Sequence, residues 1–114
     1  MTRMWNLNPA YLCTQHLLGE HKEIHQAVGS ILKGRSLKGH LEKGQLEIHN
    51  LKKRHAELVR EMKKRNFNHN SPLPDFEEFY AGKIDPQKNK LDLMKRCKKC
   101  RVRIKDQDKK EKQT

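Results

Sequence analysis

Apolar residues recur at helical spacing along the first third of the chain, at intervals of four, seven, four and three residues. They are Cys13, Leu17, Ile24, Val28 and Ile31. This spacing places them on one face of a helix. Asn8 and Pro9 can begin the helix, because Asn is a good cap and Pro suits the first helical position. The pattern predicts one long amphipathic helix from there to about Lys33, ended by Gly34.

A second helix is predicted from about Leu46 to Arg65, with an apolar face opposite a face of Lys and Arg. The apolar face consists of Leu51, His55, Leu58 and Met62. Asn66 can end this helix, because it tolerates the left-handed conformation. Three glycines stand among basic residues between the two helices, and they predict a flexible basic loop from about Gly34 to Gly44.

Helix signals are weaker after residue 70. Prolines extend the stretch "SPLPDF", after which Asp75 and Gly82 could bound a short helix. A further weak helix is predicted from about Asp85 to Arg96. Strand-like alternation is almost absent. We therefore expect an all-α fold, a compact single domain of about three helices over residues 1–94, followed by a disordered basic tail over residues 95–114.

Charge is the strongest compositional signal. The 114 residues carry a formal net charge of +12, with 35% charged and only 33% hydrophobic residues. The last twenty residues hold ten Lys or Arg against three Asp or Glu, which is +7. This balance favours a polyanionic partner, although a solvated, solubilising tail would have the same composition.

The location of the protein is predicted from features that the sequence lacks. No apolar run reaches membrane-spanning length, and the N-terminus lacks the apolar core of a signal peptide. The three cysteines do not follow a disulfide framework. We therefore expect a soluble protein of a reducing cytoplasm.

The stretch "QHLLGEHKEIHQ" (residues 15–26) suggests a metal site at first sight. His21 and His25 are four residues apart, which can place two imidazoles on one metal. In the zinc protease motif H-E-x-x-H, however, the glutamate directly follows the first histidine. Glu23 comes one position later and is turned about 200° from His21, at about 100° per residue. We therefore expect surface histidines and no metal.

The same rotation groups five other residues on one ridge beside the apolar stripe. They are His16, Gly19, Glu23, Gln26 and Ser30. Glu23 would be half buried there, next to the notch left by Gly19. A helix-face glutamate paired with a lysine fits the same spacing, so the pattern alone leaves the role of Glu23 open.

The N-terminus offers a candidate nucleophile. Removal of Met1 before the small residue Thr2 is expected and would free an α-amine. Such an amine titrates near pH 7.7 to 8.0, so that an appreciable neutral fraction exists at about pH 7. A neutral amine can attack an electrophilic carbon. Most proteins have such an amine without using it, so this feature also leaves both interpretations open.

Three segments together resemble the pyrimidine dimer DNA glycosylase family, the phage endonuclease V-like enzymes. They are the opening "MTR", "QHLLGEHKE" (residues 15–23) and "RHAELVREMKKRNFNH" (residues 54–69). The stretch "WNLNPAYL" (residues 5–12) resembles the bacterial branch. The resemblance covers about residues 1–72.

The resemblance implies a mostly helical DNA repair enzyme, a glycosylase with abasic-site lyase activity. The α-amine of Thr2 would attack C1′ of the damaged nucleotide and leave an imine, and Glu23 would stabilise the cationic sugar before β-elimination nicks the strand. No metal or cofactor is required. The implied partner is damaged double-stranded DNA. The protein would bind it as a monomer, in a cytoplasm of bacterial or phage type, where it would be associated with the nucleoid.

Four residues match DNA-binding positions of the family: Arg3, His16, Lys22 and Gln26. Lys22 and Gln26 stand where the phage enzyme has arginines, so Lys22 keeps the charge and Gln26 loses it. The basic C-terminus differs from the aromatic-rich end of that enzyme, and it could supply phosphate affinity without sequence preference.

Two other functions were weighed against this one. A small, non-enzymatic helical DNA-binding protein would use the charge alone, with Glu23 in a structural role. A zinc-dependent nuclease is the third. Cys97 and Cys100 form half of a zinc site. No second C-x-x-C pair completes it, so two histidines from elsewhere in the chain would have to supply the other ligands. We therefore expect reduced surface thiols there. The aromatic residues Trp5, Tyr11 and Phe67 are expected in the core.

Overall fold

The computed structural model describes residues 4–68 and 72–112, and it shows an all-α protein. Within these ranges the chain forms five α-helices and two short 3-10 helices, with no strand. In chain order they are η1 (Pro9–Tyr11), α1 (Thr14–Leu32), α2 (Lys38–Glu42), η2 (Ile48–Asn50), α3 (Leu51–Lys64), α4 (Pro86–Arg96) and α5 (Lys98–Lys112). None of the described helices is long and apolar enough to cross a membrane. The all-α prediction is confirmed, but the helices outnumber the three expected.

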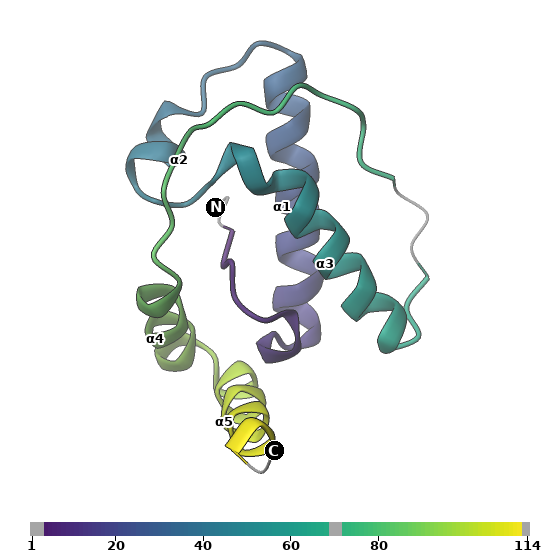
Figure 1. Cartoon of the computed structure of the whole chain (residues 1–114), viewed down its shortest axis with the longest axis vertical. Helices are drawn as coiled ribbons and strands as arrows, with labels where there is room; N and C mark the ends of the chain where they lie inside the picture. Colours follow the sequence, from purple (N-terminus) through teal and green to yellow (C-terminus); the bar gives the residue numbers. More distant parts are fainter. Residues whose placement is uncertain (1–3, 69–71, 113–114) are drawn as a thin grey trace.

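Helices α1 and α3 form the centre of the fold and pack against each other, with α3 lying across α1 in Figure 1. The predicted apolar faces are the buried faces. Those of α1 and the residue before it are Cys13, Leu17, Ile24 and Val28, with Ile31 partly buried; those of α3 are Leu51, His55, Leu58 and Met62. Positive φ angles at Gly34 and Asn66 follow the two helices, as predicted.

The first predicted helix is interrupted. Asn8 caps only the 3-10 turn η1, and an extended backbone at Leu12 and Cys13 separates η1 from α1. The side chain of Arg65, at the end of α3, donates to the carbonyl oxygens of Leu12 (2.7 Å) and Pro9 (3.3 Å). These bonds satisfy carbonyl groups that a continuous helix would have used itself. The break therefore depends on a residue more than fifty positions away in the sequence.

The segments that connect the helices differ from the expectation in two places. The predicted basic loop contains α2, and the short helix predicted between Asp75 and Gly82 does not form. Residues 72–85 instead run without helix or strand across the upper end of α1 in Figure 1. Long-range hydrogen bonds hold this segment: the Ile48 N–H donates to the Ala81 carbonyl (3.0 Å), and the Ile84 N–H donates to the Glu47 carboxylate (2.8 Å).

The C-terminus is helical, so the predicted disordered tail is wrong. Helix α4 begins at the cap residue Asp85, close to the prediction. Helix α5 then packs against α4 and η1, as the lower part of Figure 1 shows. Cys100 and Ile104 are fully buried in this contact, and the Tyr11 hydroxyl donates to Asp108 (2.7 Å). Two residues four positions apart give too narrow an apolar stripe to stand out among so many charges.

The start of the described chain is fixed inside the fold. Met4 is buried, and its N–H donates to the Gln45 carbonyl (2.7 Å). The side-chain amide of Asn89, in α4, donates to the carbonyl oxygens of Met4 (3.3 Å) and Trp5 (2.9 Å). Trp5 is buried, as predicted, and so is Tyr11. The C-terminal helices therefore hold the N-terminal segment in place.

Candidate functional site

A pocket of about 190 Å³ lies beside the N-terminal half of α1. Its lining residues come from the chain start, α1 and the end of α4. They are Trp5, Gln15, His16, Gly19, Glu20, Glu23 and Arg96. The structure thus brings three members of the predicted ridge, His16, Gly19 and Glu23, to one concave site. Gln26 and Ser30 are not among the lining residues.

Glu23 is half buried in this pocket, and Gly19 stands one turn before it. A Cβ atom added at Gly19 would meet nothing within 4 Å. The glycine therefore leaves open space next to the carboxylate.

His16 joins the pocket to a cluster of thiols. Its Nδ1 atom lies 3.2 Å from the Cys13 Sγ and 3.5 Å from the Cys100 Sγ. The ring meets Trp5 edge to face, with centroids 5.9 Å apart. Burial lowers the pKa of His16, so the neutral imidazole predominates at neutral pH.

One lining residue of the pocket, Glu20, belongs to a buried ion pair. The guanidinium of Arg54 donates to both carboxylate oxygens of Glu20, at 2.5 and 3.0 Å, and also to the Leu7 carbonyl. Burial raises the pKa of Glu20, and the ion pair with Arg54 opposes that rise. No role for Arg54 follows from the sequence, because spacing along α3 cannot reveal a partner on α1.

The predicted site residues are only partly assembled by the described structure. Thr2 and Arg3 lie outside the described residues. Lys22 and Gln26 are exposed on α1, on either side of Glu23 in the sequence. Arg96, which the sequence analysis counted only as tail charge, is the cation that lines the pocket. Nothing in the sequence links Arg96 with a helix more than seventy positions earlier.

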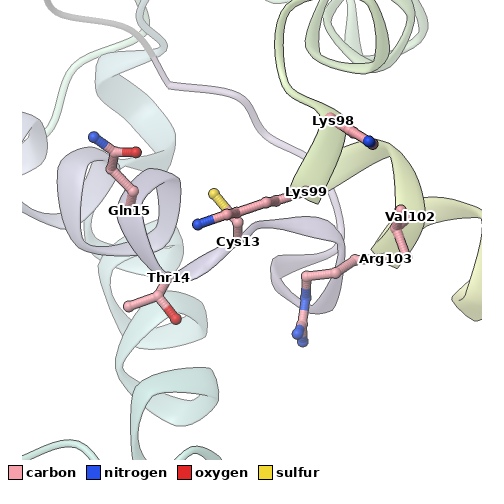
Figure 2. Close-up of a pocket in the computed structure, with 7 residues that line it drawn as sticks. All are labelled: Cys13, Thr14, Gln15, Lys98, Lys99, Val102 and Arg103. Carbon is pink, nitrogen blue, oxygen red and sulfur yellow. The ribbon is translucent and has the colours of Figure 1, made fainter.

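A larger groove of about 440 Å³ lies next to the pocket and shares Gln15 with it. Figure 2 shows its two sides: the beginning of α1, with Cys13, Thr14 and Gln15, and the first turns of α5. Helix α5 contributes Lys98, Lys99, Val102 and Arg103, and Lys99 extends toward α1. Two helix N-termini and several cations favour an anion such as a phosphate group here.

The expectation of surface histidines at His21 and His25 is wrong for His21, which is buried. His21 and His25 lie on the side of α1 that faces His55 of α3. The Nε2 atoms of His25 and His55 are 3.2 Å apart, and the three rings lie within about 5 Å of one another. The prediction failed because helical spacing does not say where the second helix crosses.

The expectation of surface thiols is also wrong. Cys100 is fully buried and Cys97 is half buried. With Cys13 and His16 they form a cluster whose ligand atoms all lie within 4.8 Å of one another. Burial raises the pKa of Cys100 to about 12. Burial also acts to raise the pKa of Cys97, but hydrogen bonds, foremost from the Cys100 N–H, lower it below its ordinary value.

Comparison with known proteins adds a family assignment. The family model described as pyrimidine dimer DNA glycosylase matches residues 2–75 of the chain. The match includes Thr2, Glu23, α1 and α3, and it ends before α4 and α5. No curated protein and no solved structure shows significant similarity to the chain.

Proposed function

The chain belongs to the pyrimidine dimer DNA glycosylase family, and on this premise we propose that it is a DNA repair glycosylase that also cleaves abasic sites. The proposed nucleophile is the α-amine of Thr2, freed by removal of Met1. The proposed carboxylate is Glu23. No metal or cofactor takes part in the proposed reaction.

One observation supports this assignment above all: Trp5 and Glu23 line the same pocket. Thr2 precedes Trp5 by three positions. Three residues of fully extended chain cover at most about 11 Å, which limits the distance between the two Cα atoms. Asn89 holds the backbone of Met4 and Trp5 through two hydrogen bonds, so this limit is measured from a backbone position that is fixed in the fold. An amine at Thr2 is therefore within reach of the pocket that contains the Glu23 carboxylate.

The proposed reaction uses each group once. A bond forms between the Thr2 nitrogen and C1′ as the glycosidic bond breaks, and the base leaves with that electron pair and takes up a proton. Glu23 stabilises the positive charge that develops at C1′, as carboxylates do in glycoside hydrolysis. Opening of the sugar ring gives the imine. Loss of the C2′ proton, with Glu23 as acceptor, then breaks the C3′–O bond and nicks the strand.

DNA binding is assigned to cations around the pocket. We propose that Arg3, Lys22 and Arg96 contact phosphates near the lesion, and that the groove at Lys98 and Lys99 holds a phosphate farther along the strand. An arginine can bind a phosphate through two parallel hydrogen bonds. His16 and Gln26 are proposed as uncharged contacts to the same strand. The net charge of +12 supports the strong, salt-dependent component of such binding.

The decisive experiment traps the imine. The full chain is incubated with duplex DNA that carries an abasic site or a pyrimidine dimer, and borohydride is added to reduce the imine to a stable amine. We expect a covalent protein–DNA adduct whose modified residue is Thr2 by mass spectrometry. The same spectrum shows whether Met1 is absent.

Two variants assign the roles. Glu23→Gln should lower the rate of nicking about hundredfold or more, whereas Glu77→Gln, at an exposed carboxylate in another segment, should leave it unchanged. A short peptide added before Thr2 should abolish the adduct and leave DNA binding nearly intact. If a chain with a free Thr2 amine gives no adduct yet binds DNA, the protein is a DNA-binding protein and the enzymatic assignment is wrong.

A further inference from the structure

Two short motifs from opposite ends of the chain meet beside the pocket. Each begins with the residue directly before a helix and ends three positions later: Cys13-x-x-His16 at α1 and Cys97-x-x-Cys100 at α5. We propose that these four residues bind one zinc ion in a tetrahedral Cys₃His site. The two-residue spacing within each pair is typical of structural zinc sites.

The distances fit this geometry. Bonds of about 2.3 Å to sulfur and about 2.0 Å to nitrogen imply ligand separations of about 3.8 Å between sulfurs and about 3.5 Å between sulfur and nitrogen. The Sγ atoms of Cys13 and Cys97 are 3.8 Å apart, and the His16 Nδ1 lies 3.5 Å from the Cys100 Sγ. All four ligand atoms lie within 4.8 Å of one another. Small side-chain rotations therefore suffice to close the site around an ion.

The surroundings suit thiolate ligands. The Cys13 N–H donates to the Cys100 Sγ (3.2 Å), and the Cys100 N–H donates to the Cys97 Sγ (3.4 Å). Such bonds orient sulfur ligands and stabilise their charge. Three thiolates and one neutral imidazole around Zn²⁺ leave a net charge of −1. The N-termini of α1 and α5, with Lys98 and Lys99, stabilise that charge.

Two other arrangements explain less. A disulfide between Cys13 and Cys97 would not explain why the Cys100 thiol and the His16 nitrogen also lie at ligand distance. The cluster of His21, His25 and His55 also has the nitrogens for a metal, but it lacks sulfur, so spectroscopy of a bound metal separates the two sites.

The proposed ion has a structural role. Four protein ligands occupy all tetrahedral positions, so no open position remains for a substrate. Helix α5 lies beyond the matched residues 2–75, and among its described residues only Cys100 and Ile104 are buried. Zinc would add a direct link from this helix to α1, beside its packing against α4 and η1. It would also fix the His16 ring through Nδ1, while the rest of the ring borders the pocket with Glu23.

The test uses the full chain, purified without a polyhistidine tag from cells grown with added zinc. We expect one zinc per chain by elemental analysis, with three thiols that react only after a chelator or mercurial removes the metal. Replacement by Co²⁺ should give an intense sulfur-to-cobalt charge-transfer band and the visible bands of tetrahedral cobalt. A chain that binds no zinc, or whose Co²⁺ complex lacks the sulfur band, would overturn the proposal.

Variants locate the ion. Cys97→Ser should weaken Co²⁺ binding by more than about hundredfold. Loss of a group that only orients a metal ligand already costs about tenfold to hundredfold in affinity, and loss of the ligand itself should cost more. The matched control, His25→Gln, removes a nitrogen from the other cluster and should leave the cobalt spectrum unchanged. Loss of metal in His25→Gln and not in Cys97→Ser would refute the assignment. Circular dichroism checks that both variants are folded, and Cys100→Ser provides a second test at the buried sulfur.

Discussion

Two glutamates one turn apart on α1 have opposite surroundings. Glu20 is buried and holds Arg54 through two hydrogen bonds, whereas Glu23 is half buried at the edge of a pocket with open space beside it. Environment decides what a carboxylate does. Glu20 is enclosed with its structural partner, whereas Glu23 lines the pocket and is the carboxylate proposed for the reaction.

The pair of Glu20 and Arg54 gives a prediction about stability. Arg54→Met leaves a buried carboxylate without its cation, and we expect a loss of about 3–5 kcal/mol in the free energy of unfolding. Lys38→Met removes one partner of an exposed pair with Glu42 and should change it by less than about 1 kcal/mol. Urea unfolding followed by circular dichroism measures both.

The pH dependence of the Arg54→Met variant checks the cause. Without Arg54, burial keeps the pKa of Glu20 above its unfolded value, so the folded state binds the extra proton. Stability then falls as pH rises above the unfolded value of about 4.3. As the pH rises above that value, the variant should lose stability more steeply than the parent chain. Adding Glu20→Gln should remove the extra slope; a slope that persists would point to another group.

At the scale of elements, α1 both builds the core and carries the site. Gly19 and Gly29 are matched positions for testing this, because both lie in α1 and a Cβ would meet nothing within 4 Å at either. Each Gly→Ala change should stabilise the helix by about 0.5–1 kcal/mol. Gly19→Ala alone places a methyl group in the pocket with Glu23. We expect it to lower kcat/KM for nicking by about tenfold to hundredfold.

Gly29→Ala provides the reference for that experiment. It should raise the melting temperature by as much as Gly19→Ala and leave nicking unchanged. Equal activities in the two variants would mean that the space beside Glu23 is not used by the substrate.

A helix could be predicted from the sequence where its own apolar face is regular enough to reveal it. The buried faces of α1 and α3 follow from spacing alone, as do the ends at Gly34 and Asn66. The break before α1 and the unwound segment over residues 72–85 depend on Arg65 and Glu47, which act on distant backbone. Helix α5 was missed because two buried residues among many charges carry almost no periodic signal.

The candidate site divides in the same way. The ridge of His16, Gly19 and Glu23 lies on one helix and could be found from its spacing. Arg54, Arg96 and the partners of Cys97 and Cys100 come from other helices, so no local pattern reveals them.

At the scale of the whole molecule, cations of α5 line the groove between the beginnings of α1 and α5. Lys98→Gln with Lys99→Gln removes two cations from the groove in Figure 2. We expect weaker binding of abasic DNA, and a slope of log affinity against log salt that is lower in magnitude by about 1.8. Nicking at saturating DNA should be unchanged, because neither lysine lines the pocket with Glu23.

A pair of the same charge at the other end of the molecule serves as control. Lys33 and Lys43 are exposed at the C-terminal caps of α1 and α2. Lys33→Gln with Lys43→Gln lowers the net charge equally and should alter the salt slope much less. Equal slopes for the two double variants would show that binding responds to total charge and not to the groove.

The hydrogen bonds from Asn89 to Met4 and Trp5 have a consequence for how the protein is made. The ribosome releases the N-terminal segment first, but the amide that fixes it is synthesised more than eighty residues later. A nascent chain that already contains α1 and α3 can pair Met4 with Gln45, but it still lacks the two bonds from Asn89. The pocket, which Arg96 at the end of α4 also lines, is therefore complete only after α4 has been synthesised.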